Sequence, residues 1–181
     1  MKIPVSLALK GKRDVATLPA ASIVCKLLCP ERILLDISAV SKQAVIEDIG
    51  AMFEKSCGIE RARIVASLLA RERLGSTALG HGIAIPHGRM KGLKDVRGGF
   101  VRLSEPVPFD APDGKPVSLL FVLLVPEHAN EQHLGLLSEL AQLFADRDFR
   151  AMLATAAHSS AIIELFSQWQ THGKDQRRPA V

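Results

Sequence analysis

His87 is the residue whose surroundings best suit it for chemistry. It lies near the end of the segment Gly82-Ile83-Ala84-Ile85-Pro86-His87-Gly88. The ring of Pro86 holds Ile85 in an extended conformation, and Gly88 leaves the space beside the imidazole free of a side chain. A histidine held this way is suited to act as a nucleophile if one ring nitrogen is deprotonated and the other N–H is bound by an acceptor. A turn histidine with no role is the alternative that the local sequence leaves open.

Basic residues are concentrated on both sides of this histidine. Between Arg71 and Arg102 the chain has seven Lys or Arg residues against two acids. Such an excess of positive charge would attract a phosphoryl dianion or an acidic partner. The seven are Arg71, Arg73, Arg89, Lys91, Lys94, Arg97 and Arg102. For Lys91, Lys94 and Arg97 a solvated loop is the favoured interpretation.

Two blocks together carry a resemblance to a known family. Arg71-Glu72-Arg73-Leu74-Gly75-Ser76-Thr77, followed by residues 82–88, resembles the signature of the mannitol/fructose-type IIA proteins of the bacterial phosphoenolpyruvate-dependent phosphotransferase system. The block is specific because it joins a basic residue, a Gly-Ser-Thr turn and an Ala-x-Pro-His ending at fixed spacing. The resemblance extends over about residues 29–169, and within the family it is strongest to the nitrogen-regulatory IIA proteins.

The resemblance implies roles for three residues. His87 would accept a phosphoryl group on Nε2 from a phosphorylated HPr-like carrier protein. His133, at the start of a later helix, and Arg71, sixteen residues before His87, would donate hydrogen bonds and positive charge to the phosphoryl oxygens. Phosphoryl transfer requires mainly positioning and charge stabilisation of this kind from a protein.

The other residues that could do chemistry have simpler interpretations. Histidines could form a metal site, but no carboxylate pattern accompanies them, so neither a metal nor a cofactor is expected. The histidines concerned are His81, His87, His128 and His133. The three cysteines, Cys25, Cys29 and Cys57, have no second pair at zinc-finger spacing, and reduced thiols are expected. Ser76 and Thr77 are interpreted as turn caps rather than phosphate ligands.

The expected function is that of a regulatory phosphocarrier, a phosphotransferase component whose phosphorylation state controls partner kinases or transporters. One alternative is a sugar-specific IIA component that passes the phosphoryl group to a IIB domain. Another is a binding module with a vestigial site. The sequence contains no recognisable IIB, IIC or HPr-like segment, which favours the regulator, and the presence of His87, His133 and Arg71 together disfavours a vestigial site.

Composition excludes other classes of protein. The net charge of +4 comes from the two ends, since residues 1–32 have six bases against two acids and residues 174–181 have three against one. The remaining body has a net charge of −2, and aromatic residues are few, which argues against nucleic-acid binding. The longest later apolar run, residues 119–125, is far shorter than the ~20 residues of a membrane-spanning helix. A cytoplasmic protein without membrane insertion is therefore expected.

Helical periodicity predicts two helices before the histidine and three after it. Ser41 is expected to cap the first helix, Gly58 to end it, and a second helix is expected over about residues 60–73, antiparallel to the first. Further helices are expected over about residues 130–144, after Asp146, and after a cap at Ser159 or Ser160.

Strands are predicted at residues 33–35, around 83–85, from residue 100 and over 117–125. The last is almost continuously apolar, as expected for a strand buried on both faces. This order of elements predicts an α/β fold, a mixed β-sheet covered by helices, as in the mannitol/fructose-type IIA proteins. Residues 1–28 are interpreted as a poorly ordered extension, 29–171 as the IIA domain and 172–181 as a tail.

Overall fold

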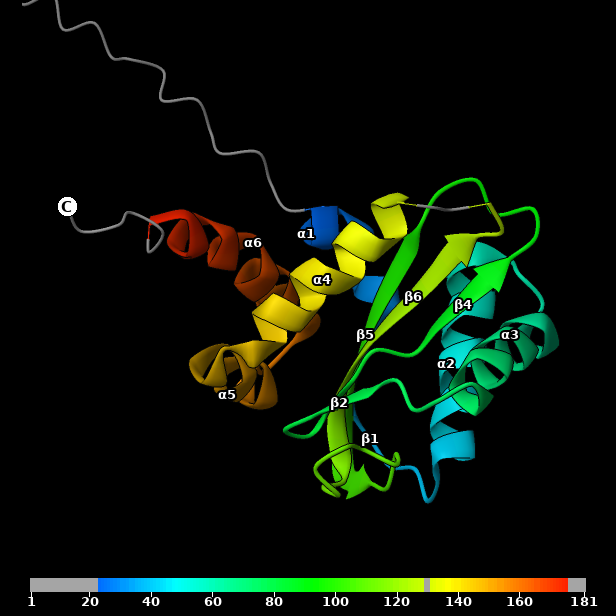
Figure 1. The fold of residues 1–181 in the computed structure, drawn as a ribbon, viewed down its shortest axis with the longest axis horizontal. Coiled ribbons are helices and arrows are strands. Elements are labelled where there is room, and N and C mark those ends of the chain that lie inside the picture. Colours follow the sequence, from blue (N-terminus) through cyan, green and yellow to red (C-terminus); the bar gives the residue numbers. More distant parts are fainter. Residues whose placement is uncertain (1–22, 129–130, 176–181) are drawn as a thin grey trace, which may run out of the picture.

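The computed structural model describes residues 23–128 and 131–175, with the backbone alone for residues 23, 131–133 and 170–175. Its centre is a mixed six-stranded sheet in which β5 and β6 form the longest pair (Figure 1). Neighbouring strands follow the order β1-β5-β6-β3-β2, and β4 also pairs with β6, beyond the end of β3. The strands are β1 (Ile33–Ile37), β2 (Ala78–Gly80), β3 (Ile83–Ala84), β4 (His87–Met90), β5 (Arg97–Val107) and β6 (Val117–Pro126).

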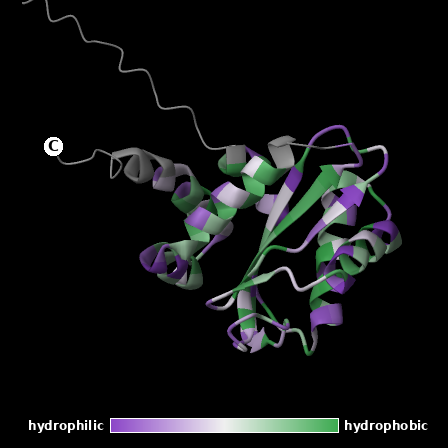
Figure 2. Ribbon diagram, viewed as in Figure 1, coloured by the Kyte–Doolittle hydropathy of each residue, from purple (hydrophilic) through white to green (hydrophobic). Residues whose placement is uncertain are grey.

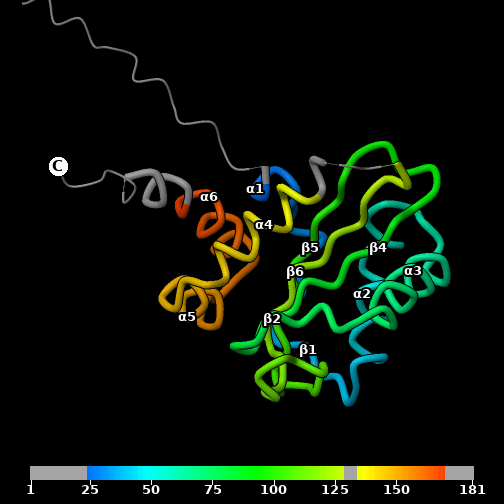
Figure 3. The backbone as a smooth tube through the Cα atoms, in the orientation of Figure 1, coloured from blue at the N-terminus to red at the C-terminus, as the bar shows by residue number. Residues whose placement is uncertain are grey.

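Helices cover both faces of this sheet. α2 and α3 lie on one face, and α1, α4, α5 and α6 lie on the other, as the ribbon and the backbone tube both show (Figures 1 and 3). The helices are α1 (Ile23–Leu27), α2 (Lys42–Cys57), α3 (Arg61–Arg73), α4 (Glu131–Ala145), α5 (Arg147–Thr155) and α6 (Ser159–Asp175), with a 3₁₀ turn, η1 (Pro30–Arg32), before β1. This arrangement confirms the predicted α/β fold with a mixed sheet covered by helices.

β6 separates two hydrophobic cores. Phe121 and Leu123 pack with α4, α5 and α6, whereas Leu120 and Val122 pack with α2 and α3. All four are fully buried, so the prediction of a strand buried on both faces is confirmed. The hydropathy colouring shows the apolar residues gathered along this strand and on the helix surfaces that face it (Figure 2).

Three predicted helix boundaries are confirmed, at Ser41, Gly58 and Asp146, and one differs. The Ser41 hydroxyl accepts a hydrogen bond from the Ala44 N–H, and Gly58 ends α2 with a φ of 67°. The Asp146 carboxylate accepts from two N–H groups at the start of α5. The cap of α6 differs from the prediction, since the imidazole of His158, not Ser159 or Ser160, accepts from the Ala161 N–H at 3.2 Å.

Two further differences concern short elements. β4 was missed because its residues, His87-Gly88-Arg89-Met90, show no apolar alternation; it is a strand because it pairs in parallel with β6, with His87 opposite Leu123. Residues 23–28 were expected in the extension, but residues 23–27 form α1, and Val24 and Leu28 are buried against the core. The expected extension otherwise covers residues 1–22, which lie outside the described residues, as do residues 176–181 of the expected tail.

Candidate active site

His87 is the first residue of β4 and lies beside α3. Its backbone is fixed by the pairing with Leu123, whose N–H donates to the Pro86 carbonyl at 3.0 Å. The sequence explained Gly88 by free space beside the imidazole, but the structure shows a stronger requirement. A Cβ at position 88 would lie 2.5 Å from the Ser67 Oγ of α3, so glycine is needed for β4 to approach this helix.

Both ring nitrogens of His87 have a hydrogen-bond partner that defines their state. Nδ1 lies 2.8 Å from the Ile85 carbonyl oxygen, which can only accept, so Nδ1 carries the proton. Nε2 lies 3.0 Å from Nε of Arg71, which can only donate, so Nε2 presents its lone pair. This is the tautomer that a nucleophilic Nε2 requires.

The electrostatics of the site favour the neutral imidazole. Burial lowers the pKa of His87 below its ordinary value of 6.5, and the charge of Arg71 acts in the same direction. The hydrogen bond to Ile85 and the charge of Glu72 oppose this shift without reversing it. The half-buried ring therefore keeps a lone pair on Nε2 at neutral pH.

Arg71 reaches the imidazole from the last turn of α3. The helix ends at Arg73, and the chain then turns through Gly75, whose φ of 143° favours glycine. Nη1 of Arg71 donates to the Gly75 carbonyl at 2.9 Å, while Nε holds His87. Among the described residues these bonds occupy Nε and Nη1, which leaves Nη2 available to an anionic ligand.

The other candidate histidines belong to other segments of the chain. His133 falls in the first turn of α4, and its side chain lies outside the described residues. His81 is exposed in the turn between β2 and β3, where its N–H donates to the Asp113 carboxylate. His128 is also exposed. In the described part of the chain, no group of three or more histidine, cysteine or acidic side chains could hold a metal ion.

The seven basic residues of the 71–102 stretch do not form one patch around His87. Arg102 lies on the opposite face of the sheet, where it pairs with Asp36 and donates to carbonyl oxygens of Leu153 and Ala156 at the end of α5. Lys91 and Lys94 are exposed in the loop after β4, which agrees with the solvated-loop interpretation. Arg71 is the member of the set that the structure places in contact with His87.

A buried carboxylate beside Arg71 was not recognised in the sequence. Glu72 has a side chain only 6% exposed and accepts hydrogen bonds from Lys42 and from both the N–H and hydroxyl of Thr77. The turn-cap interpretation of Thr77 is consistent with these bonds. One signal was available in the sequence, since an acid in the last turn of a helix is unfavourable beside the helix dipole unless a partner compensates it.

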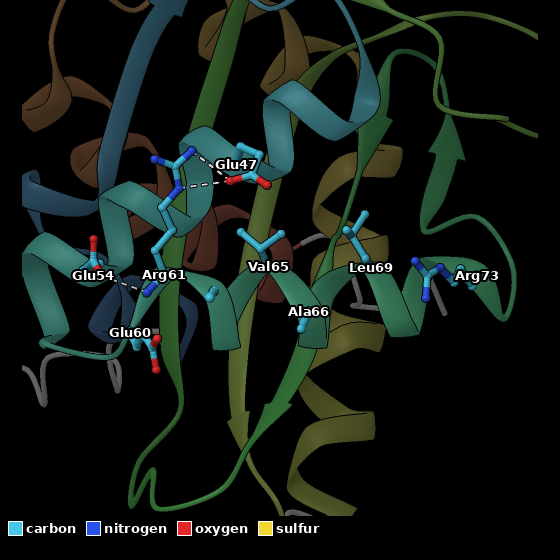
Figure 4. Close-up of a pocket in the computed structure, with 9 residues that line it drawn as sticks. Glu47, Glu54, Glu60, Arg61, Val65, Ala66, Leu69 and Arg73 are labelled. Atoms are coloured by element: carbon cyan, nitrogen blue, oxygen red, sulfur yellow. Dashed lines mark hydrogen bonds and ion pairs between the residues drawn. The ribbon is translucent and has the colours of Figure 1, made fainter.

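A groove between α2 and α3, crossed by the ion pair of Arg61 with Glu47 at 2.8 Å, is not lined by His87 or Arg71 (Figure 4). Among the described helices, none combines the length and apolar character needed to cross a bilayer.

Comparison with known proteins identifies a matching family. Residues 26–169 match the family model described as "Phosphoenolpyruvate-dependent sugar phosphotransferase system, EIIA 2". Proteins named "Nitrogen regulatory protein" are similar to the chain: that of Pseudomonas aeruginosa is 41% identical over 77% of this chain and 92% of its own length, and that of Bradyrhizobium diazoefficiens 36% identical over 80% and 94%.

A solved structure extends the similarity to three dimensions. The crystal structure of the nitrogen regulatory protein IIA-Ntr from Neisseria meningitidis is 44% identical, with a TM-score of 0.76 over 80% of this chain and 99% of that chain. The resemblance inferred from residues 71–88 is thereby confirmed. The chain belongs to the EIIA 2 family of the phosphoenolpyruvate-dependent sugar phosphotransferase system.

Proposed function

We propose that the chain is a phosphocarrier that accepts a phosphoryl group on Nε2 of His87 from a phosphorylated HPr-like protein. The observation that carries the proposal is the pair of bonds on the imidazole: the Ile85 carbonyl holds the proton on Nδ1, and the lone pair of Nε2 faces Arg71. A ring fixed in this tautomer is ready to attack phosphorus without a separate base.

In the proposed step the phosphorus–nitrogen bond of the donor phosphohistidine breaks as the bond from phosphorus to Nε2 of His87 forms. The donor ring, protonated on its other nitrogen, keeps the electron pair of the broken bond and leaves as a neutral imidazole. His87 retains its proton on Nδ1 and becomes a phosphoimidazolium, and its hydrogen bond to Ile85 strengthens because the donor is now charged. Arg71 gives up its bond to Nε2 and turns its N–H groups to the equatorial phosphoryl oxygens. His133 remains the proposed second donor.

We further propose that the phosphorylation state regulates partner proteins, such as kinases or transporters. Because His87 keeps its Nδ1 proton, the added phosphoryl group changes the net charge beside Arg71 by about one unit and brings new acceptor oxygens, which can alter a protein interface. The similarity to proteins named nitrogen regulatory proteins supports this choice. A sugar-specific IIA role, with transfer to a IIB domain, is the second candidate, because the matching family model is described as a sugar system.

The test is incubation of the full chain with phosphoenolpyruvate, enzyme I and an HPr-type carrier. We expect one acid-labile, alkali-stable phosphate per chain, which His87→Ala removes and His81→Ala, at an exposed turn, does not. We expect His133→Ala to slow labelling but leave His87 phosphorylatable. Failure of any such carrier to label the wild type would contradict the proposal, and equal loss in His87→Ala and His133→Ala would mean that their roles are misassigned.

Adding a IIB domain to the phosphorylated protein separates the two candidate roles. Rapid, complete transfer to a fructose- or mannitol-type IIB domain would support the sugar-specific role. Retention of the phosphoryl group, together with phosphorylation-dependent binding to a kinase or transporter, would support the regulator.

A further inference from the structure

Glu72 is an acidic residue in an unusual place. It directly follows Arg71 in the last turn of α3, where the helix dipole disfavours negative charge, and its side chain is only 6% exposed. A carboxylate so placed is stable only when its oxygens are bound by donors or cations. Its partners therefore indicate what it does.

Both carboxylate oxygens of Glu72 are occupied, and by different parts of the chain. Oε2 accepts from the Thr77 N–H at 3.1 Å and from the Thr77 hydroxyl at 2.6 Å. Oε1 accepts from Nζ of Lys42 at 2.9 Å. The first pair of bonds closes the loop of residues 74–77 against the end of α3, and the third connects the end of α3 to the start of α2.

Lys42 joins three segments that are far apart in the sequence. From the first turn of α2 its ammonium group contacts Glu72, and at 2.7 Å it contacts the carboxylate of Asp110, which follows β5. The same group lies 5.0 Å from the centre of the Phe109 ring. Burial alone would lower the pKa of Lys42, but the hydrogen bonds to Asp110 and Glu72 raise it above its ordinary value, so the side chain stays charged.

The loop held in this way contains the carbonyl group that orients Arg71. Gly75 lies inside the 74–77 loop, and its carbonyl oxygen accepts from Nη1 of Arg71 at 2.9 Å. The Nε of the same guanidinium contacts His87. Because one planar guanidinium makes both bonds, the position of this carbonyl sets the direction in which Nε faces the imidazole.

We propose that Lys42 and Glu72 are positioning residues for phosphoryl transfer, which hold the 74–77 loop so that the Gly75 carbonyl aims Arg71 at Nε2 of His87. This inference rests on the proposed function, because it assigns Lys42 and Glu72 a role through Arg71 and His87. Neither residue touches the phosphoryl group. Their part is to fix the geometry of the group that does.

Lys42 has a second, electrostatic effect on the same site. The charge of Glu72 raises the pKa of His87 and would repel an incoming phosphoryl dianion. Lys42, 2.9 Å from that carboxylate, balances this charge. Removal of the Lys42 charge therefore disturbs the site in two ways: the carboxylate that holds the loop loses its bond to α2, and the negative charge near His87 is no longer compensated.

The test compares Lys42→Met, Lys42→Arg and Lys55→Met in the full chain. Lys55 is an exposed lysine in the last turn of the same helix and serves as the matched control. The first measurement is the single-turnover rate of phosphorylation by the phosphorylated HPr-type carrier. For Lys42→Met we expect a fall of about 10- to 100-fold, the range for a misplaced catalytic group. Lys42→Arg should recover part of the rate, and Lys55→Met should match the wild type.

The second measurement is the NMR titration of the His87 imidazole in the unphosphorylated protein. We expect its midpoint to move to higher pH in Lys42→Met, because the charge of Glu72 is then uncompensated, and to stay at the wild-type pH in Lys55→Met. This readout does not need phosphorylation. If no carrier labels the wild type, the proposed function fails while the titration still tests whether Lys42 acts on His87.

A wild-type rate together with an unchanged His87 titration in folded Lys42→Met would overturn the proposal. If Lys42→Met does not fold, Thr77→Val provides the same test, because it removes the 2.6 Å hydroxyl bond to Glu72 and keeps the shape of the side chain. For Thr77→Val we expect a smaller fall in rate, and the wild-type rate in that folded variant would also overturn the proposal.

Discussion

Arg71 and Arg102 occupy two regions of the molecule that make opposite use of the same side chain. At the end of α3, Arg71 is half-buried and has N–H groups left over after its bonds to Gly75 and His87. In the middle of β5, the side chain of Arg102 is 10% exposed and all three of its nitrogens donate to protein oxygens. The hydrogen bonds from Nε and Nη2 both go to the Asp36 carboxylate, at 2.8 and 2.7 Å, and form a bidentate ion pair.

This difference shows why counting charges along the sequence was a weak guide to the site. Arg102 was grouped with Arg71 because both fall in one basic stretch. In the structure Arg102 ties β1 and β5 to the end of α5, and four of its five N–H donors bind protein oxygens. An arginine can bind a ligand when several of its five N–H donors have no protein partner. It stabilises the fold when most of those donors bind protein oxygens.

The sharpest test of the comparison is Arg71→Met, which should impair transfer and leave the fold intact. We expect the rate of His87 phosphorylation to fall by about 10²- to 10³-fold, as for loss of a donor that stabilises transition-state charge. Rapid-quench labelling with the phosphorylated carrier measures this rate. Arg73→Met, at an exposed position two residues later, is the control. If the rate of His87 phosphorylation fell equally in both variants, Arg71 would contribute only general positive charge.

Arg102→Met should show the reverse pattern. The Leu153 and Ala156 carbonyls lose their donor, and we expect the free energy of unfolding to fall by about 2–3 kcal/mol, the cost of buried groups left without partners. Urea denaturation measures the loss, with Arg147→Met at an exposed position of α5 as the control. The folded fraction should still be phosphorylated at the wild-type rate. A fall in that rate would show that Arg102 acts on the site after all.

Gly88→Ala tests whether the closeness of β4 and α3 sets the distance from Arg71 to His87. The new Cβ would lie 2.5 Å from the Ser67 Oγ and 3.3 Å from the Leu68 backbone nitrogen, so the Ser67 side chain, the strand or the helix must shift, at a cost of about 1–3 kcal/mol in the free energy of unfolding. We also expect slower phosphorylation, because the imidazole moves with its strand. Gly135→Ala is a suitable control, since a Cβ there meets no atom within 4 Å. Unchanged stability and rate in Gly88→Ala would show that the contact has no such role.

The smallest expected effect is on the titration of His87. Because its pKa is lowered by burial and by Arg71, we expect an NMR midpoint below 6.5, and a higher midpoint in Arg71→Met. Phosphoryl acceptance should be lost as the pH falls through that midpoint, where the lone pair of Nε2 is protonated. A midpoint at or above 6.5 in the wild type would contradict the environment described for this ring.

The same shift has a defined effect on stability. A histidine whose pKa is lower in the folded state binds fewer protons there than in the unfolded chain. Its contribution to the free energy of unfolding therefore falls as the pH drops below about 6.5, and it levels off below the folded pKa. Urea titrations of wild type and His87→Ala at pH 8 and pH 5 should show a larger loss in the wild type.

Much of the fold was predictable because its signals are local. The Ser41 cap, the Gly58 end of α2 and the Asp146 cap each depend on a hydrogen bond or a backbone conformation within a few residues. The apolar run that forms β6 is equally direct, since a strand buried on both faces has no polar positions. β4 could not be predicted in this way, because its four residues form a strand only when β6 lies beside them.

The candidate site, like the fold, was predictable only where its signals are local in the sequence. The sequence by itself singled out His87, because Pro86 and Gly88 constrain its backbone locally, and the block of residues 71–88 identified the family. It could not assign the tautomer of His87, separate Arg71 from Arg102, or reveal Lys42 and Glu72. The tautomer depends in part on Ile85, two residues away, but the other contacts that decide these properties join residues 16 to 66 positions apart. Only the tertiary structure decides them, because burial and the geometry of donors and acceptors do not exist until the two helices and the sheet have packed together.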